Sequence, residues 1–320
     1  MNRAMAPKIS VVMPCYNAEA FLPLSVGSLL AQTFSNWELV AVDDGSTDGT
    51  LAWLQAQGDA RIHVVSQPNG GVSAARNLAL RLASGELVAF LDADDSWAPD
   101  FMARMVAALQ PRADAVLAYC GWQNVGLPGG RGLPFVPPDY ERADKEETLF
   151  AGCRWPIHAA LARRQALLEA GGFDTRLTQA EDYALWLRVA GRAPIVRLPE
   201  VLACYHFRDV GQATSQRAQG ALHLLRAQEL YLVERPAFAH RIGRKRRRQI
   251  MLDRLLQQGY DCYWRRDLTA ARTIFRAVMR SGYGAPRDWV YMLPAWMPAA
   301  WHRRLLRLRD ARARTPHGQA

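Results

Sequence analysis

The sequence predicts an α/β fold in which a mostly parallel sheet is flanked by helices and followed by a helical, basic C-terminal region. Short apolar runs alternate with segments of helical spacing through the first 91 residues, as in a parallel sheet with crossover helices. The last run, 87–91, is continuously apolar, as expected for a strand covered on both faces. The charge then changes sign, because residues 1–240 carry a net −4 and residues 241–320 a net +14.

Length and composition set the number of domains. The chain has 320 residues, of which 50% are hydrophobic, so it can bury a large core and is not a disordered chain. Domains commonly contain about 150 residues, so this length suggests two domains. We expect the first over 1–218 and the second, helical and basic, over 219–320.

Each secondary-structure element has its own signal. In the first part, strands are expected over 8–14, 37–42, 62–66 and 86–91, and helices over 21–31, 51–57 and 73–82. The next part is less regular, with strands expected at 115–120 and 157–163, one or two short strands within 194–207, helices at 99–109, 165–170 and 182–190, and an exposed loop at 126–138. From about Gln219 the pattern is helical, and one helix face carries Leu268, Ala271, Ile274, Phe275 and Val278.

Three acids stand within four residues directly after the apolar run 87–91. Asp92 and Asp94 offer hard oxygen ligands at the carboxyl end of a strand, where open α/β sheets bind ligands. One interpretation is a divalent metal that bridges a phosphate. The other is an acidic turn in which Asp95 and Ser96 cap the following helix. This segment alone leaves both open.

A second acidic pair, Asp43 and Asp44, follows the strand expected at 37–42. An acid at this edge can accept hydrogen bonds from a base or a ribose, as in other nucleotide-binding α/β folds. The alternative is a capping loop before the next helix, and the segment alone favours it.

Four segments taken together resemble the family 2 glycosyltransferases, which are inverting nucleotide-sugar enzymes with a GT-A fold. In chain order they are Ser10–Asn17, Val42–Asp48, Asn69–Asn77 and Phe90–Asp95. A later family motif is matched by Gly171–Asp174 followed by Glu181–Trp186. The resemblance covers roughly residues 8–215. Each segment is weak alone, but their order and spacing are specific.

The resemblance implies a donor site. Pro14 and Tyr16 match the first-strand motif that lines the nucleotide base. Asp43 matches the residue that pairs with the uracil edge, and Asp44 lies beside it. Arg76 matches an arginine near the base and the diphosphate.

The resemblance also implies a metal ligand and a base. Asp92 and Asp94 match the DXD motif, with Asp92 near the ribose and Asp94 holding Mn²⁺ or Mg²⁺ on the diphosphate. Asp182 matches the general base that deprotonates the acceptor hydroxyl. Without the other motifs, Asp182 would be interpreted as an acid stabilised by the dipole at a helix N-terminus.

Five further residues could contact the acceptor or the diphosphate. Trp155 and His158 precede the strand expected on the acceptor side, Glu181 adjoins Asp182, and His206 and Arg208 stand where the family often has a basic residue. Packing roles are the alternative for Trp155 and His158, and a structural role for the latter pair. The Gln-x-x-Arg-Trp motif of processive synthases is not evident after Asp182, which indicates the addition of one sugar.

The basic C-terminal region has two interpretations. Aromatic residues beside arginines in 289–309 suit an interfacial membrane segment, and its uncharged stretch is too short to span a bilayer. The alternative is a helical cap with a solvated basic face and its Trp side chains packed inside. Arg244–Arg248 could suggest nucleic-acid binding, but no aromatic-interleaved nucleic-acid motif accompanies it, so we do not expect nucleic acid as a partner.

The family resemblance and the basic C-terminal region also indicate which partners to expect. The donor is a nucleotide sugar, UDP-linked by family resemblance, with thymidine and guanosine donors left open. The acceptor is a glycan or a lipid-linked glycan, which suggests cell-surface polysaccharide biosynthesis. Five scattered cysteines and no visible signal peptide suit the cytoplasm or the inner face of its membrane. The alternative function is a nucleotide-binding module or membrane adaptor without transferase activity.

Overall fold

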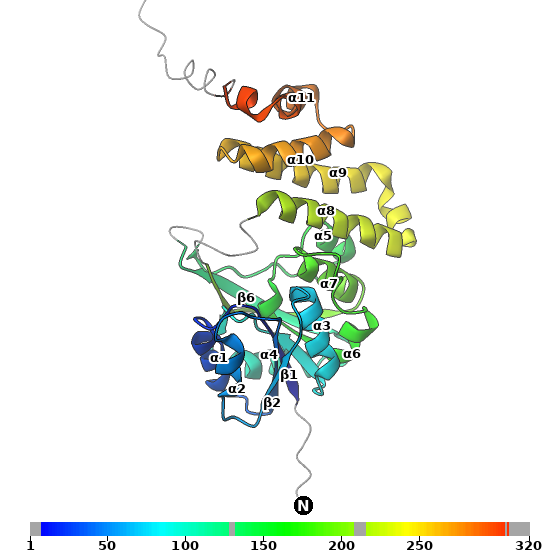
Figure 1. Cartoon of the computed structure of the whole chain (residues 1–320). Coiled ribbons are helices and arrows are strands. Elements are labelled where there is room, and N and C mark those ends of the chain that lie inside the picture. The colour runs from blue at the N-terminus through cyan, green and yellow to red at the C-terminus, as the bar shows by residue number, and fades with distance from the viewer. Residues whose placement is uncertain (1–7, 128–131, 208–215, 305, 307–320) are drawn as a thin grey trace, which may run out of the picture. The chain divides into compact units, whose positions relative to one another are not determined.

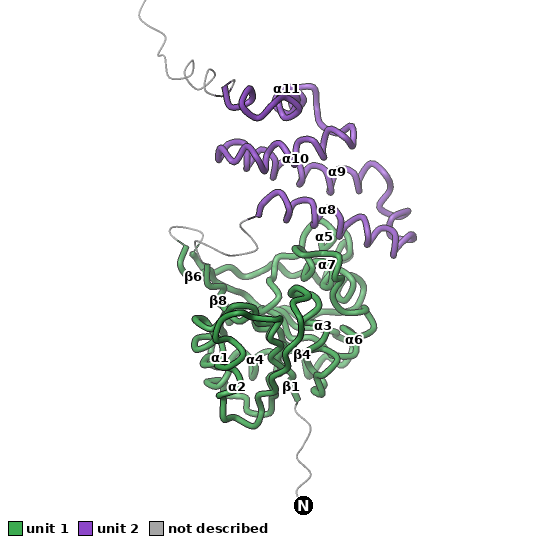
Figure 2. Tube along the Cα trace, in the orientation of Figure 1, with its two compact units in different colours: residues 1–212 green, residues 213–320 purple. Residues whose placement is uncertain are grey.

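The computed structural model of this chain describes residues 8–127, 132–207, 216–304 and 306. The chain divides into two compact units, residues 1–212 and residues 213–320 (Figure 2). The first holds the sheet and its helices, and the second is helical (Figure 1).

The first unit is built on an eight-stranded mixed sheet. In chain order its strands are β1 (Ile9–Cys15), β2 (Trp37–Asp43), β3 (Ile62–Ser66), β4 (Leu87–Phe90), β5 (Ser96–Trp97), β6 (Leu117–Val125), β7 (Ala160–Arg163) and β8 (Ile195–His206). Their order in the sheet is β3-β2-β1-β4-β7-β6-β8-β5. The first four strands are parallel, which confirms the strands expected up to residue 91.

The helices of this unit follow the expected pattern except for α5, which the sequence analysis did not predict. They are α1 (Leu22–Leu30), α2 (Thr50–Gln55), α3 (Val72–Leu82), α4 (Phe101–Leu109), α5 (Lys145–Ala151), α6 (Arg164–Glu169) and α7 (Glu181–Ala190). Helix α3 packs on β1 and β2, and α4 packs on β6, β7 and β8. Every residue of β2 and β4 is buried, and burial on both faces explains the continuous apolar run of β4.

The second half of the sheet departs from the sequence prediction. The strand expected over 157–163 is a 3₁₀ turn (Ile157–Ala159) followed by β7, which runs antiparallel to β4 and β6. The short strands expected within 194–207 are one long strand, β8, whose register with β6 shifts around Gly121. A Cβ atom at Gly121 would lie 2.9 Å from the carbonyl oxygens of Glu200 and Phe135, so the backbones meet there only because this residue is glycine.

The second unit is a stack of helices. They are α8 (Arg217–Glu234), α9 (Pro236–Trp264), α10 (Leu268–Arg280), α11 (Pro286–Met292) and the short 3₁₀ helix η4 (Leu293–Trp296). The predicted apolar face of α10 is confirmed, since Ala271, Ile274, Phe275 and Val278 lie in the core of this unit. Helix α9 approaches α10 closely at Gly259, where a Cβ would lie 2.6 Å from the Phe275 ring. Among the described helices, none has both the length and the apolar character needed to cross a bilayer.

Candidate active site

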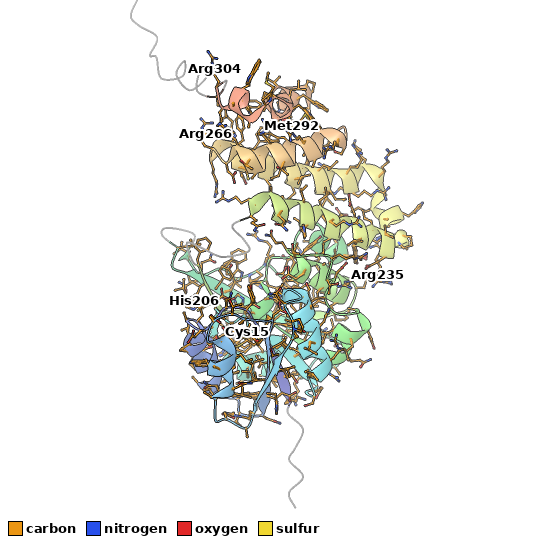
Figure 3. The ribbon with its side chains drawn as sticks, in the orientation of Figure 1. Cys15, His206, Arg235, Arg266, Met292 and Arg304 are labelled. Carbon is orange, nitrogen blue, oxygen red and sulfur yellow. The ribbon has the colours of Figure 1, made fainter. Side chains whose placement is uncertain are left out.

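Several of the predicted site residues lie at or just after the ends of neighbouring parallel strands, at one edge of the sheet. Register pairs Cys15 with Asp43 and Val12 with Phe90, so β1, β2 and β4 end close together. The carboxylate-bearing turn that starts at Asp92 therefore lies on the same edge as the loops after β1 and β2. Cys15 and His206, labelled in Figure 3, are the last residues of β1 and β8.

Asp44 is buried and fully engaged with its own loop. Its carboxylate accepts hydrogen bonds from the Gln67 side chain (2.6 Å) and from the backbone N–H groups of Gly70 (2.9 Å) and Gly71 (2.8 Å). Gly71 has φ 85°, which favours glycine, and it directly precedes α3. Asp44 thus holds the loop that begins α3.

Asp43 is also buried but keeps accepting capacity. Its carboxylate receives the Ser66 hydroxyl (2.9 Å) and the Ser46 backbone N–H (3.2 Å), while two carboxylate oxygens can accept about four hydrogen bonds. Tyr16 is 54% exposed and Pro14 is partly buried. Cys15 pairs with Asp43 in the sheet, so Tyr16 follows the adjacent strand end, and an exposed aromatic ring and a carboxylate acceptor at adjacent strand ends suit a planar base.

Arg76 joins two parts of the site. It is buried, and its Nη2 donates to both oxygens of Asp92 (2.7 and 3.0 Å) while its Nη1 donates to Oε1 of Glu181 (2.8 Å). Burial alone would lower the pKa of Arg76, but the charges of Asp92 and Glu181 raise it well above its ordinary value. The side chain is therefore a fixed cation that α3 supplies to both carboxylates.

Asp182 lies in the first turn of α7, next to this cation. Ala180 before it has a left-handed φ of 57°, and the Asp182 carboxylate accepts the Tyr183 backbone N–H at 2.7 Å. Burial, reinforced by the charge of Glu181, raises the pKa of Asp182 from 3.8 to about 6, although the Tyr183 N–H and Arg76 oppose the shift. A helix dipole acting alone would lower this pKa. A carboxylate with a raised pKa is a stronger proton acceptor near neutral pH.

Asn77, whose role the sequence did not reveal, fixes the loop before α7. Its side-chain amide donates to the Phe173 carbonyl oxygen and accepts the Phe173 backbone N–H, each at 2.8 Å. A Cβ on Gly172 would lie 2.5 Å from the Asn77 amide oxygen. The Phe173 ring packs edge-on against Phe90 and faces the Arg76 guanidinium at 5.3 Å. The Gly171–Asp174 motif is therefore attached to α3.

Asp95 does not cap a helix, so that interpretation is wrong. The residue before α4 is Asp100, and Asp95 is fully buried in an ion pair with His158, at 3.0 Å between Oδ2 and Nδ1. Its other oxygen accepts the His206 backbone N–H at 3.0 Å. Burial lowers the pKa of His158, but the carboxylates, Asp95 first, outweigh burial and raise it. This pair ties the acidic turn to β8 and to the turn before β7.

The other uncertain residues have different surroundings. Trp155 is buried and stacks on Tyr119 at 4.4 Å, which favours a packing role. The His206 ring contacts the Ser96 hydroxyl at 2.8 Å. Arg208 lies outside the described residues.

The acidic turn is suited to a metal ion that is held jointly by the protein and by the phosphate oxygens of a bound substrate. Asp92 and Asp94 are both partly exposed, and the described part of the chain has no group of three or more His, Cys, Asp or Glu residues able to hold an ion by itself. Mg²⁺ is commonly held by one or two carboxylates together with substrate phosphate oxygens. The donor set fits this kind of site.

Comparisons with known proteins agree with the motifs. The family model described as Glycosyl transferase family 2 matches residues 10–166. The putative teichuronic acid biosynthesis glycosyltransferase TuaG of Bacillus subtilis is 44% identical over 57% of this chain and 71% of its own length. The Escherichia coli glucosyltransferase WfgD, named for transfer from UDP-Glc to GlcNAc-diphosphoundecaprenol, is 32% identical over 57% of this chain and 69% of its own length.

The chain belongs to glycosyltransferase family 2. It spans only 24% of another relative, an uncharacterised protein of Sinorhizobium fredii. Among solved structures, residues 1–349 of S. aureus TarS in complex with UDP match with a TM-score of 0.58 and 21% identity, over 85% of this chain and 81% of that one. The mannosyltransferase PcManGT of Pyrobaculum calidifontis, in complex with GDP-Man and Mn²⁺, matches with a TM-score of 0.57 and 21% identity, over 91% and 79%. The fold is thus the GT-A type that the sequence resemblance implied.

Proposed function

We propose that this chain is a metal-dependent, inverting glycosyltransferase that moves one sugar from a UDP-sugar to a hydroxyl of a glycan or lipid-linked acceptor in cell-surface polysaccharide biosynthesis. The observation that carries the proposal is the group of Asp92, Arg76, Glu181 and Asp182. It joins the acidic turn of the donor side to a carboxylate with a raised pKa. A reaction inside the cytoplasm suits the five scattered cysteines of the sequence.

In this proposal Asp182 accepts the proton of the acceptor hydroxyl. The freed oxygen forms a bond to the anomeric carbon as the bond from that carbon to the diphosphate breaks, which inverts the centre and releases the nucleoside diphosphate. No covalent intermediate on the enzyme is needed. The pKa of Asp182, raised to about 6, leaves it largely ionised at pH 7.5 yet more basic than an ordinary aspartate.

The donor side has separate tasks. Asp43 accepts a hydrogen bond from the uracil edge and the exposed Tyr16 ring lies against the base. Asp92 serves the ribose and is oriented by Arg76. Asp94, with Asp92 beside it, would hold Mn²⁺ or Mg²⁺, which when bound neutralises the charge that develops on the leaving diphosphate. A UDP donor accords with the UDP complex of TarS, while PcManGT, with its GDP-Man complex, keeps guanosine as the competitor.

A thermal-shift screen tests the donor. The purified chain is heated with UDP, GDP, dTDP or CDP, each with Mn²⁺, Mg²⁺ or EDTA. We expect UDP with a divalent ion to raise Tm, since a ligand at 100 times its Kd stabilises the native state by about 2.7 kcal/mol. Asp94→Asn should lose the metal-dependent part. No shift with any nucleotide would contradict the proposal, and a shift without sugar transfer across an acceptor panel would favour a binding module instead.

A further inference from the structure

The second unit exposes an uninterrupted apolar segment close to the last of its described residues. All six residues from Trp296 to Trp301 are nonpolar and exposed, with Trp296 at 51% and Trp301 at 66%. Upstream, Val290 is 70% and Leu293 54% exposed, one helical turn apart. We call Val290, Leu293 and 296–301 the tryptophan strip. Exposed apolar surface of this extent on a folded unit commonly marks an interaction site.

The strip faces outward because its backbone is fixed from inside. Four residues that lie between its members or after them along the chain are buried: Met292, Ala295, His302 and Leu306. From α10, Arg272 donates to the Met297 carbonyl oxygen at 2.6 Å, and Arg276 donates to the Ala295 carbonyl oxygen at 2.9 Å. The strip is thus part of the folded unit rather than a frayed end. The alternative interpretation, a helical cap with its Trp side chains packed inside, is wrong for Trp296 and Trp301.

Positive charge surrounds the strip. Residues 268–306 contain six arginines and one acid, Asp288. Asp288 is held by the Tyr260 hydroxyl and the Ala285 backbone N–H. The guanidinium groups of Arg276 and Arg280 lie over the Trp296 ring, at 5.4 and 5.5 Å. Arg303 and Arg304, the latter labelled in Figure 3, are exposed two and three residues after Trp301.

We propose that the tryptophan strip docks this protein on an anionic lipid bilayer. Tryptophan prefers the interface between headgroups and acyl chains, and arginines at that depth are attracted to anionic headgroups. The one-signed charge around an apolar surface matches such a bilayer, which offers apolar depth beneath negative charge. Pro294 and Pro298 interrupt the segment, so it lies in the interface and does not cross. The surface is complete within the second unit and does not depend on the proposed transferase activity.

Vesicle co-sedimentation of the full chain tests the proposal, without nucleotide or metal. The vesicles are phosphatidylcholine with or without phosphatidylglycerol, at physiological ionic strength. We expect binding to the anionic vesicles only. Trp296→Ser combined with Trp301→Ser should weaken it by roughly tenfold or more, because both indoles leave the interface. Both side chains are exposed, so the variant should keep its Tm, and Val233→Ser, at a 79% exposed apolar residue of α8, is the matched control.

Charge variants test whether vesicle binding depends on the arginines around the strip or only on the overall positive charge of the protein. Neutralising Arg280, Arg303 and Arg304 to Gln should weaken binding by about fivefold per residue, the factor that corresponds to ~1 kcal/mol for an arginine near an anionic surface. Neutralising Arg244, Lys245 and Arg246, an exposed basic cluster of α9, changes the charge equally and should cost far less. Equal losses in the two triple variants, or no binding by the folded parent, would overturn the proposal. A dimer of the full chain that the double Trp variant converts to a monomer would assign the strip to a second copy and also overturn it.

Discussion

Replacing Arg76 with Met should destabilise the first unit and change the pH dependence of transfer. The substitution keeps an unbranched side chain on α3 but removes the cation that Asp92 and Glu181 share. Removing one partner of a buried ion pair costs about 3–5 kcal/mol. The Asp92 side chain is 25% exposed and that of Glu181 12%, so water can replace part of the lost interaction. We therefore expect the lower end, about 3 kcal/mol.

This loss is measurable as a change in Tm. For a unit of this size, 1 kcal/mol corresponds to roughly 2–4 °C, so Arg76→Met should lower Tm by roughly 6–12 °C. Arg81→Met is the matched control, because Arg81 is exposed on the same helix and surface substitutions usually stay within about 0.5 kcal/mol. Arg76→Lys should recover only part of the stability, since one ammonium cannot bridge two carboxylates as a planar guanidinium does. Equal Tm values for Arg76→Met and Arg81→Met would refute the reasoning.

The pH dependence gives a second, independent readout. Arg76 lowers the pKa of Asp182, so its removal should raise that pKa above the present value of about 6. The acid limb of the rate profile of Arg76→Met should then move to higher pH, while Arg81→Met keeps the parent profile. If Arg76→Met still catalyses transfer and the acid limb of its rate profile is unchanged, Arg76 does not influence the pKa of Asp182.

Three further predictions concern the same site. Asp182→Asn should lower transfer by about 10²–10⁴-fold, the usual range for a general base. The raised pKa of Asp182 favours the folded state below about pH 4, and this contribution is lost as pH rises through about 6. In denaturant titrations the free energy of unfolding of the Asn variant should therefore exceed that of the parent at pH 8 by up to about 3 kcal/mol, but not at pH 4. Asn77→Ala leaves the Phe173 backbone groups unpaired and should cost about 1–3 kcal/mol by the same titration, an effect absent if the loop is held elsewhere. His158→Gln removes the cation from buried Asp95. Because the pKa of His158 is raised, its contribution is present below its ordinary pKa and lost as pH rises through the folded value, so the deficit in Tm should be larger at pH 6 than at pH 9.

The sequence predicted strands best where every face of the strand is buried and the pattern involves only neighbouring residues. Strands β1, β2 and β4 are largely buried on both faces, so mostly apolar runs mark them in the sequence, and the acids Asp43 and Asp92 stand at or just after their ends. The antiparallel half gave weaker signals. Strand β5 has two residues, too few for any period, and the break in β6 depends on a backbone contact at Gly121 that only the partner strand reveals.

The contacts within the site were harder to predict than its members. The motifs named Arg76, Asp92 and Asp182, but local patterns cannot say that Asn77 binds Phe173, 96 residues away. The same holds for Asp95, which stands where a helix cap is expected and instead pairs with His158. Such pairs are tertiary, and a single sequence records the residue types without the partner.

The adjacent pair Arg76–Asn77 shows how one helix can position the proposed base. Successive helix residues point about 100° apart, so two neighbours can serve two different segments. Arg76 reaches the first turn of α7 through Glu181, and Asn77 holds the loop that leads to that turn through Phe173. The left-handed backbone at Ala180, a strained conformation for alanine, lies between these two attachments. Because both attachments come from α3, and Asp44 fixes the loop that begins α3, the position of Asp182 is referenced to the donor side of the sheet rather than to α7 alone.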